Sequence, residues 1–427
     1  MGEPTVSQIE NAFLPAKEIT DTERFAGREG SVKDAYYALL AEGANIAVVG
    51  NRGIGKTSLS RQIAKIGSGD SSLLNKIELK HDGSLDFLTV YMACGSQISS
   101  TDELLERLLT SNSCLADWIY DIPSAKKIMV NYSPKFSAGV PGLGLELGGT
   151  KETDTTAYHA ISNHSIDVVF TNVVDAIAKE KIAKNGVLIV VDEFDQIPDP
   201  RGFASFLKAL ATNSPNVKFC LVGVAKDIQA LMKEHESTDR LFAGSIIHLD
   251  PMSPKELTAI ITNAETHIND YIIFTPGAKD KLVSLSQGHP YMVHLIGKFA
   301  LRNAFHGGKK EITEDDIDNT LADIAQRKAD PILEGKYRKA VASSSHREIV
   351  LKSLAGVTDG HGEIWTTNAY RNALDKGVDN SSQYVGQLVT EEYGAEVEKL
   401  RDRYYRFKDS LFQAYVLARP AMYKENG

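Results

Sequence analysis

The sequence is poor in cysteine, in net positive charge and in long apolar runs. Its 427 residues include only three cysteines, Cys94, Cys114 and Cys220. An odd number of widely spaced cysteines excludes a disulfide framework and a Cys-x-x-Cys metal site, and is typical of a reducing compartment. The 47 basic and 56 acidic side chains leave a net charge of −9. That balance excludes a polycationic chain, so contact with nucleic acid requires a local basic patch.

Membrane signals are also missing. No segment approaches the ~18 consecutive apolar residues of a membrane helix. The start, Met1-Gly2-Glu3-Pro4, lacks the basic and apolar regions of a signal peptide. We therefore expect a cytoplasmic protein without a membrane partner. The length predicts two to three domains at about 150 residues each.

Short apolar runs alternate with helical patterns in the first 250 residues. The run at 44–49 is bounded by glycine, and the run at 187–191 leads into acidic residues. Such runs are typical of strands in a parallel sheet, because both of their faces are buried. The predicted strands lie at 44–49, 87–92, 187–191, 219–222 and 245–249. The alternation predicts an α/β fold with a mostly parallel sheet and helices on both faces.

The strongest motif is Gly50-Asn51-Arg52-Gly53-Ile54-Gly55-Lys56-Thr57, a complete GxxxxGK[ST]. It lies between a predicted strand and a predicted helix, which is the context of a P-loop. Glycines let main-chain N–H groups approach phosphate oxygens, and the helix start adds a positive dipole. We expect Lys56 to reach the β- and γ-phosphates and the Thr57 hydroxyl to hold Mg²⁺. The predicted nucleotide-binding residues here are Asn51, Arg52, Gly53, Ile54, Gly55, Lys56, Thr57 and Ser58.

The strand at 187–191 ends in Asp192-Glu193, the Walker B form. Asp192 is expected to hold Mg²⁺ with Thr57, and Glu193 to orient and deprotonate the attacking water. Asp195, a third acid nearby, is expected to be a turn residue.

Signatures of other P-loop classes are not matched. The GTPase pattern [NT]KxD fails at 75–78, which ends in glutamate, and the only LSGGQ-like segment, 285–288, comes after Walker B instead of before it.

From residue 253 onward the pattern becomes helical. Ser253 and Glu256 form a capping box around Pro254 at the first helical position. Three helices, a hairpin and a closing helix follow between residues 346 and 418, an order typical of a winged helix. We expect an N-terminal arm (1–20), a P-loop core (21–252) with a hairpin insert at 131–165, an all-α lid (253–328), a charged connector (326–342) and a winged-helix domain (343–427).

Phe25-Ala26-Gly27-Arg28-Glu29, followed by both Walker motifs, a helical lid and a winged helix, resembles the AAA+/STAND ATPases. The most similar members are bacterial and archaeal relatives of origin-recognition ATPases, and the resemblance covers residues 20–420. It implies that Phe25, Gly27 and Arg28 flank an adenine, so that the nucleotide is ATP. It also implies an arginine before the fifth core strand that acts on the γ-phosphate of a neighbouring subunit.

Arg240 occupies that position, so we predict it to be the arginine finger. Its cation would offset the charge that develops on the phosphoryl group. The alternative role is a surface arginine at the end of a helix.

Two positions depart from the family pattern. The strand at 219–222 leads into Gly223-Val224-Ala225 where the family carries a polar γ-phosphate sensor, with Lys226 or Asp227 as possible substitutes. In the lid, Gly288-His289-Pro290 resembles the GxP signature of STAND switch ATPases, which implies that His289 faces the β-phosphate. Otherwise His289 only begins a helix. These departures imply slow hydrolysis and a nucleotide-governed switch.

The winged helix invites a DNA-binding hypothesis, but its charge does not favour one. Residues 343–427 hold 11 basic and 12 acidic side chains, and the expected recognition helix at 381–390 has no cation. Lys and Arg normally supply most of the affinity for DNA. Gln383 and Gln387 would have to read adenine, and Arg401, Arg403 and Arg406 would have to contact the backbone. A winged helix that contacts protein or inhibits the ATPase is favoured.

The sequence therefore predicts an ATP- and Mg²⁺-dependent assembly switch with weak ATPase activity, which forms homo-oligomers according to its nucleotide. Two alternatives stay open. One is a DNA-binding initiator or transposition-type ATPase. The other is the ATPase subunit of a defence system, with a separate effector or regulator protein as its partner.

Overall fold

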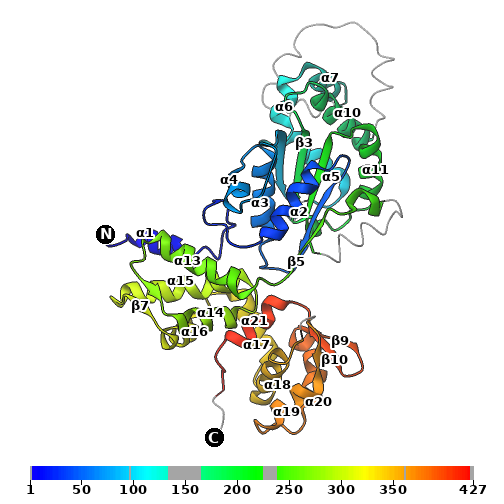
Figure 1. Ribbon diagram of the computed structural model, residues 1–427. Helices are drawn as coiled ribbons and strands as arrows, with labels where there is room; N and C mark the ends of the chain where they lie inside the picture. Colours follow the sequence, from blue (N-terminus) through cyan, green and yellow to red (C-terminus); the bar gives the residue numbers. More distant parts are fainter. Residues whose placement is uncertain (1, 96–97, 133–164, 225–237, 360–361, 424–427) are drawn as a thin grey trace, which may run out of the picture. The chain divides into compact units, whose positions relative to one another are not determined.

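The computed structural model describes residues 2–95, 98–132, 165–224, 238–359 and 362–423 (Figure 1). These residues form two compact units. The α/β unit comprises Arg28–Gly50 and Lys56–Leu249, and the helical unit comprises Met1–Gly27, Asn51–Gly55 and Asp250–Gly427. Almost all of the hairpin expected at 131–165 lies outside the described residues, as do Lys226 and Asp227.

The α/β unit is built on a five-stranded sheet in which every pairing is parallel. The strand order is β2-β3-β4-β1-β5. Strands β3 and β4 are buried over their whole length, as expected of central strands with both faces covered. The predicted α/β fold with a P-loop-type parallel sheet is therefore confirmed. The strands are β1 (Ile46–Gly50), β2 (Phe87–Ala93), β3 (Gly186–Asp192), β4 (Val217–Gly223) and β5 (Ile246–Leu249).

Helices cover both faces of this sheet, because successive strand residues point to opposite sides. On one face, Val187, Ile189 and Val191 share a core with α5, α10 and α11. Helix α3 packs on β1 to β4, and α2 packs on β1 and β5. The helices of this unit are α2 (Glu29–Leu40), α3 (Lys56–Gly67), α4 (Ser72–Lys76), α5 (Thr101–Thr110), α6 (Ala116–Asp121), α7 (Pro123–Tyr132), α10 (Ile166–Lys179) and α11 (Phe203–Asn213), with short 3₁₀ turns η1 (Phe194–Gln196) and η2 (Thr238–Phe242).

The helical unit begins with a helix where an irregular arm was expected. Thr5 and Gln8 form a capping box that starts α1, and α1 packs on α13 and α15. Phe13, just beyond α1, is fully buried against Phe274 and His294. The lid elements are α1 (Val6–Ala12), α13 (Pro254–His267), β6 (Ile273–Phe274), α14 (Pro276–Ser286), α15 (Pro290–His306), β7 (Glu311–Ile312) and α16 (Glu314–Arg327).

Residues 331–423 form what we call the C-terminal module. Part of the connector expected at 326–342 is a helix, α17, whose buried Glu334 accepts hydrogen bonds from Tyr415 and Arg419 on and after α21. The elements are α17 (Pro331–Val341), α18 (Ser345–Ala355), β8 (Ile364–Trp365), α19 (Thr366–Leu374), α20 (Ser381–Leu388), η3 (Glu391–Tyr393), β9 (Val397–Arg401), β10 (Tyr404–Phe407) and α21 (Ser410–Ala418). In the described parts of the chain, no helix is long and apolar enough to cross a membrane.

Candidate nucleotide-binding site

The P-loop lysine lies at the carboxyl edge of the parallel sheet. Strand β1 ends at Gly50 and helix α3 begins at Lys56, so the loop 51–55 joins a strand end to a helix start. The Lys56 ammonium donates a hydrogen bond to the Gly50 carbonyl at 3.0 Å. Thr57 and Ser58 follow in the first turn of α3, and the start of a helix favours an anion through its dipole.

The Walker B carboxylate lies at the same edge, one strand away from β1. Strand β4 separates β1 from β3, and β3 ends at Asp192. The Asp192 side chain is buried, and it accepts hydrogen bonds from the Tyr91 hydroxyl at 2.7 Å and from the Glu193 N–H at 2.9 Å. A carboxylate and the Thr57 hydroxyl are hard oxygen donors, so these residues fit Mg²⁺. When bound, the ion would neutralise phosphate charge.

Tyr91, which the sequence did not single out, positions Asp192. It lies on β2, beside β3, and its hydroxyl is also 2.8 Å from the Ser60 Oγ of α3. The Arg61 guanidinium lies 3.5 Å from the centre of its ring. Burial and the Asp192 charge raise the pKa of Tyr91 well above its usual range, so its hydroxyl stays protonated and donates to Asp192. The only signal in the sequence was a tyrosine within an apolar strand.

Glu193 is held in a strained main-chain conformation, with φ 56° and ψ 36°. Left-handed geometry is uncommon outside glycine and costs about 1–3 kcal/mol, a cost that is frequent at functional sites. Burial, followed by the charges of Asp192 and Asp195, raises the pKa of Glu193, and the Lys56 charge opposes that rise. The structure therefore brings the predicted catalytic residues Lys56 and Glu193 within electrostatic reach of one another.

The end of β4, where the family carries a polar sensor, is filled by an acid from another element. A Cβ on Gly223 would lie 2.8 Å from Oδ1 of Asp195, which belongs to η1. Glycine at 223 thus lets the Asp195 carboxylate approach the strand. Asp195, expected only as a turn residue, takes the position between β1 and β3 that a sensor side chain would occupy.

In the helical unit, the loop Asn51–Gly55 packs against the starts of two helices. The Gly53 carbonyl accepts a hydrogen bond from the Tyr291 N–H of α15 at 3.4 Å. The Asn51 amide donates to the Ser410 hydroxyl of α21 at 3.0 Å. Gly53 has φ +71°, and a Cβ there would lie 2.9 Å from Leu411 Cδ2. Only glycine allows both this conformation and this close approach.

The Gly288-His289-Pro290 triplet lies in the same unit and next to the loop. A Cβ on Gly55 would be 3.9 Å from Pro290, the first residue of α15. His289 is 2% exposed and stands at the N-cap position of α15. The structure thus places His289 close in the chain to a P-loop contact, while its predicted role at the β-phosphate stays a prediction.

The remaining predicted residues divide between the two units. In the helical unit, Phe25 is buried and Gly27 packs closely on Glu256 of α13. In the α/β unit, Arg28 is the N-cap residue of α2. Arg240 lies in η2, where its side chain is exposed. An exposed arginine is available to a second molecule, as a residue acting in trans must be.

Changing Tyr91 to Phe tests its positioning role. The variant keeps the ring against Arg61 but removes the hydroxyl that donates to Asp192. We expect the Mg²⁺ concentration for half-maximal hydrolysis to rise about tenfold or more, because partners that orient a metal ligand have effects of that size. A Mg²⁺ titration of ATPase activity measures this.

Tyr337→Phe is the matched control, since it removes a buried hydroxyl that donates to the Glu348 carboxylate at 2.6 Å in the C-terminal module. It should lower the melting temperature and leave the Mg²⁺ requirement unchanged. Equal Mg²⁺ requirements in Y91F and the unchanged chain would contradict the role of Tyr91.

The raised pKa of Glu193 predicts the pH dependence of hydrolysis. A general base works only when deprotonated, and a raised pKa keeps Glu193 protonated up to a higher pH than an ordinary glutamate. The single-turnover rate should therefore fall on acidification at a higher pH than an unperturbed carboxyl would give. Glu193→Gln should lower the rate by about 10²–10⁴-fold and remove this acid limb. An acid limb that persists in E193Q would assign the titration to another group.

The chain is similar to known proteins. The family model described as novel STAND NTPase 1 matches residues 14–391. The Walker-type ATPase PABY2304 of Pyrococcus abyssi has a similar structure, with TM-score 0.50 and 16% identity, over 94% of this chain and 98% of that one. The ORC2 protein of Aeropyrum pernix, solved as ADPNP–ADP complexes, gives TM-score 0.47 and 15% identity over 98% and 96% of the two chains.

No curated protein matches the sequence. The family match spans most of the chain, and the similar structure from Pyrococcus abyssi shares its fold. The chain therefore belongs to the novel STAND NTPase 1 family and is a P-loop NTPase of the AAA+/STAND type.

Proposed function

We propose that this chain is an ATP-binding, slowly hydrolysing switch whose nucleotide controls its C-terminal module and its assembly with further copies. The observation that carries the proposal is the packing of the loop Asn51–Gly55. Within the helical unit, this loop contacts α15 of the lid through Gly53 and α21 of the C-terminal module through Asn51 and Gly53.

A phosphate received by this loop would act on both helices. Main-chain N–H groups of a P-loop must turn toward the phosphates to bind them. Any such adjustment at Gly53 changes the space next to Leu411 and the hydrogen bond from the Tyr291 N–H. Packed interiors respond to such changes by moving between discrete arrangements. Nucleotide occupancy would therefore bias the position of α21.

Slow hydrolysis is supported by the acid beside β4. Catalysis of phosphoryl transfer depends on cations and hydrogen-bond donors aimed at the developing charge. The Asp195 carboxylate at Gly223 supplies neither, and it adds negative charge near Glu193. We infer that Arg240, exposed on η2, supplies the missing cation to a neighbouring copy. Assembly would then accelerate hydrolysis.

Light scattering coupled to gel filtration tests the switch. We expect the mass of the full chain to differ between saturating ATP and saturating ADP. Arg240→Ala should leave nucleotide affinity unchanged while removing most of the concentration-dependent ATPase activity, because arginine fingers contribute about 10³–10⁵-fold in related NTPases. Arg371→Ala, which alters an exposed arginine of α19, should change neither property. One mass in every nucleotide state, with binding verified, would reject the switch.

The contact between Leu411 and the P-loop yields a separate prediction. Leu411→Ala removes the side chain packed at Gly53, so ADP should no longer restrain α21. We expect faster nucleotide exchange in L411A and assembly without ATP. Leu388→Ala removes an equally buried leucine of α20, with a similar stability loss of about 2–5 kcal/mol. If both variants exchange nucleotide at the same rate, the effect comes from destabilisation and the Leu411 contact has no special role.

The DNA-binding alternative gains no support from the β9–β10 hairpin, where a DNA-contacting wing was expected. Arg401 makes two hydrogen bonds to Glu363, and Arg406 pairs with Glu398. Arg403 lies 3.8 Å from the Asp402 carboxylate. On α20, the side-chain Oε1 of Gln387 accepts a hydrogen bond from the Arg347 guanidinium at 2.7 Å. Side chains that DNA recognition would use are thus engaged within the module, which favours a switch.

A further inference from the structure

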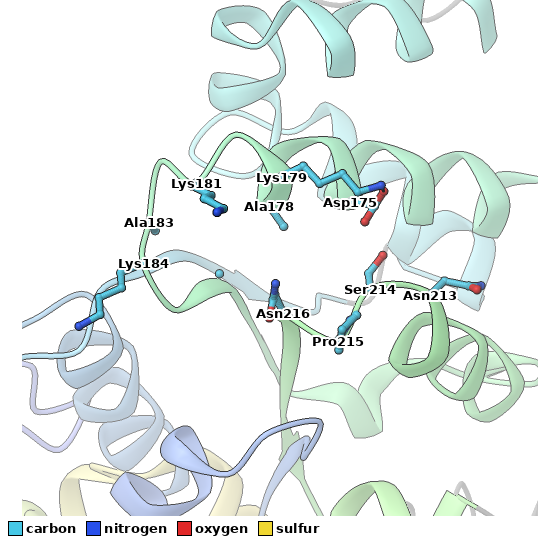
Figure 2. A pocket seen from close by; sticks show the side chains of 11 residues that line it. Asp175, Ala178, Lys179, Lys181, Ala183, Lys184, Asn213, Ser214, Pro215 and Asn216 are labelled. Carbon is cyan, nitrogen blue, oxygen red and sulfur yellow. The ribbon is translucent and has the colours of Figure 1, made fainter.

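The α/β unit contains a cavity at the amino edge of its sheet, opposite the Walker residues. Its volume is about 680 Å³. The end of α10 and the following loop form one side, and the turn between α11 and β4 forms the other (Figure 2). Strand β3 starts at this cavity with Gly186 and ends at Asp192. Seven strand residues span about 20 Å, so the cavity is separate from the nucleotide site.

The charged lining of this cavity is basic. It contains Lys179, Lys181 and Lys184 and a single acid, Asp175, which leaves two positive charges in excess. Asp175 is paired with Lys179 at 2.6 Å. Lys181 has φ +52°, and Figure 2 shows its side chain extending along the cavity, whereas Lys184 extends outward. Lysine on a flexible stem is a common ligand of phosphate as a point charge.

The opposite wall offers uncharged hydrogen-bonding groups. Ser214 is 2% exposed, and its hydroxyl oxygen has no hydrogen-bond partner among the described residues. A buried polar group left without a partner is costly and calls for an explanation. The Asn216 carbonyl is engaged by the Val187 N–H at 2.9 Å, but its side-chain amide points up from the turn toward α10 in Figure 2.

The rest of the lining consists of the polar Asn213 and of small apolar residues, Ala178, Ala183, Gly186 and Pro215. A volume of this size lies within the range of about 300–1,000 Å³ that small-molecule sites occupy. The net positive charge of the lining suits a phosphate monoester, which is close to a dianion at neutral pH.

We propose that this cavity binds a small phosphorylated metabolite. The phosphate lies against Lys181, which has no ion pair among the described residues, and the hydroxyl or amide groups of the rest of the molecule lie against Asn216 and Ser214. The proposal is independent of the switch function, because it concerns binding at the other edge of the sheet.

Binding of ribose 5-phosphate, with ribose as the uncharged match, tests the proposal by calorimetry. The full chain carrying Lys56→Ala is used, so that the P-loop does not contribute phosphate binding. We expect this protein to bind ribose 5-phosphate and not ribose. Lys181→Glu should weaken binding at least about tenfold, because a charge-assisted contact is replaced by repulsion. Lys208→Glu changes an exposed lysine of α11 outside the cavity and should have no effect.

Ser214→Ala separates a binding role from a structural one. The hydroxyl has no partner in the free protein, so S214A should keep or raise the melting temperature while it weakens ribose 5-phosphate binding. Failure of ribose 5-phosphate to bind, or binding that K181E leaves unchanged, would overturn the proposal. So would Lys181-dependent binding of a single-stranded oligonucleotide in place of ribose 5-phosphate, since that outcome assigns the surface to a polymer.

Discussion

The strand order of the parallel sheet is the constraint on which the nucleotide chemistry depends. Because β4 lies between β1 and β3, the ends of the two Walker strands flank the end of β4. Whatever β4 carries at Gly223 therefore faces the space between Lys56 and Asp192. At the end of β4, position 223 is a glycine without a side chain. The carboxylate of Asp195, which belongs to η1, lies in the space that a side chain at 223 would take. A carboxylate therefore lies in this chain where the family pattern has a polar sensor, and this substitution is the basis on which we propose slow hydrolysis.

A second constraint is the glycine at the centre of the P-loop. From the sequence, Gly53 is predicted to let main-chain N–H groups approach the phosphate, because a Cβ at this position would obstruct them. The structure shows a second reason for glycine at this position. A Cβ on Gly53 would come too close to Leu411 and Tyr291. The glycine that packs against the C-terminal module is therefore also the one predicted to admit phosphate. Two functions that share one glycine cannot vary independently, which is the physical requirement for coupling nucleotide state to module position.

Much of the fold and the Walker residues could be predicted, because both rest on local signals. Buried strands of β-branched residues and a complete GxxxxGK[ST] need no distant partner to be recognised. Tyr91 and Asp195 could not be found this way, since their roles depend on register with β3 and on the missing side chain at Gly223. Helix α1 was not predicted, because the sequence marks it only by a capping box and not by an apolar stripe. Helix α17 was not predicted, because its acid Glu334 reads in the sequence as part of a solvated charged segment. Only the structure shows that Glu334 is buried and accepts a hydrogen bond from Arg419.

The location of charge is more informative than its total. The net charge of −9 excludes a polycation and nothing more. On the β9–β10 hairpin, Arg401, Arg403 and Arg406 each lie beside a carboxylate, so the charge of these arginines is compensated. At the amino edge of the sheet, Lys181 and Lys184 have no such neighbour among the ion pairs of the described residues, and they flank a cavity with a buried hydroxyl. An acidic protein can therefore hold a small anion where a few lysines remain uncompensated. It can do so while its overall charge, and the pairing of the three hairpin arginines, do not favour a long nucleic acid.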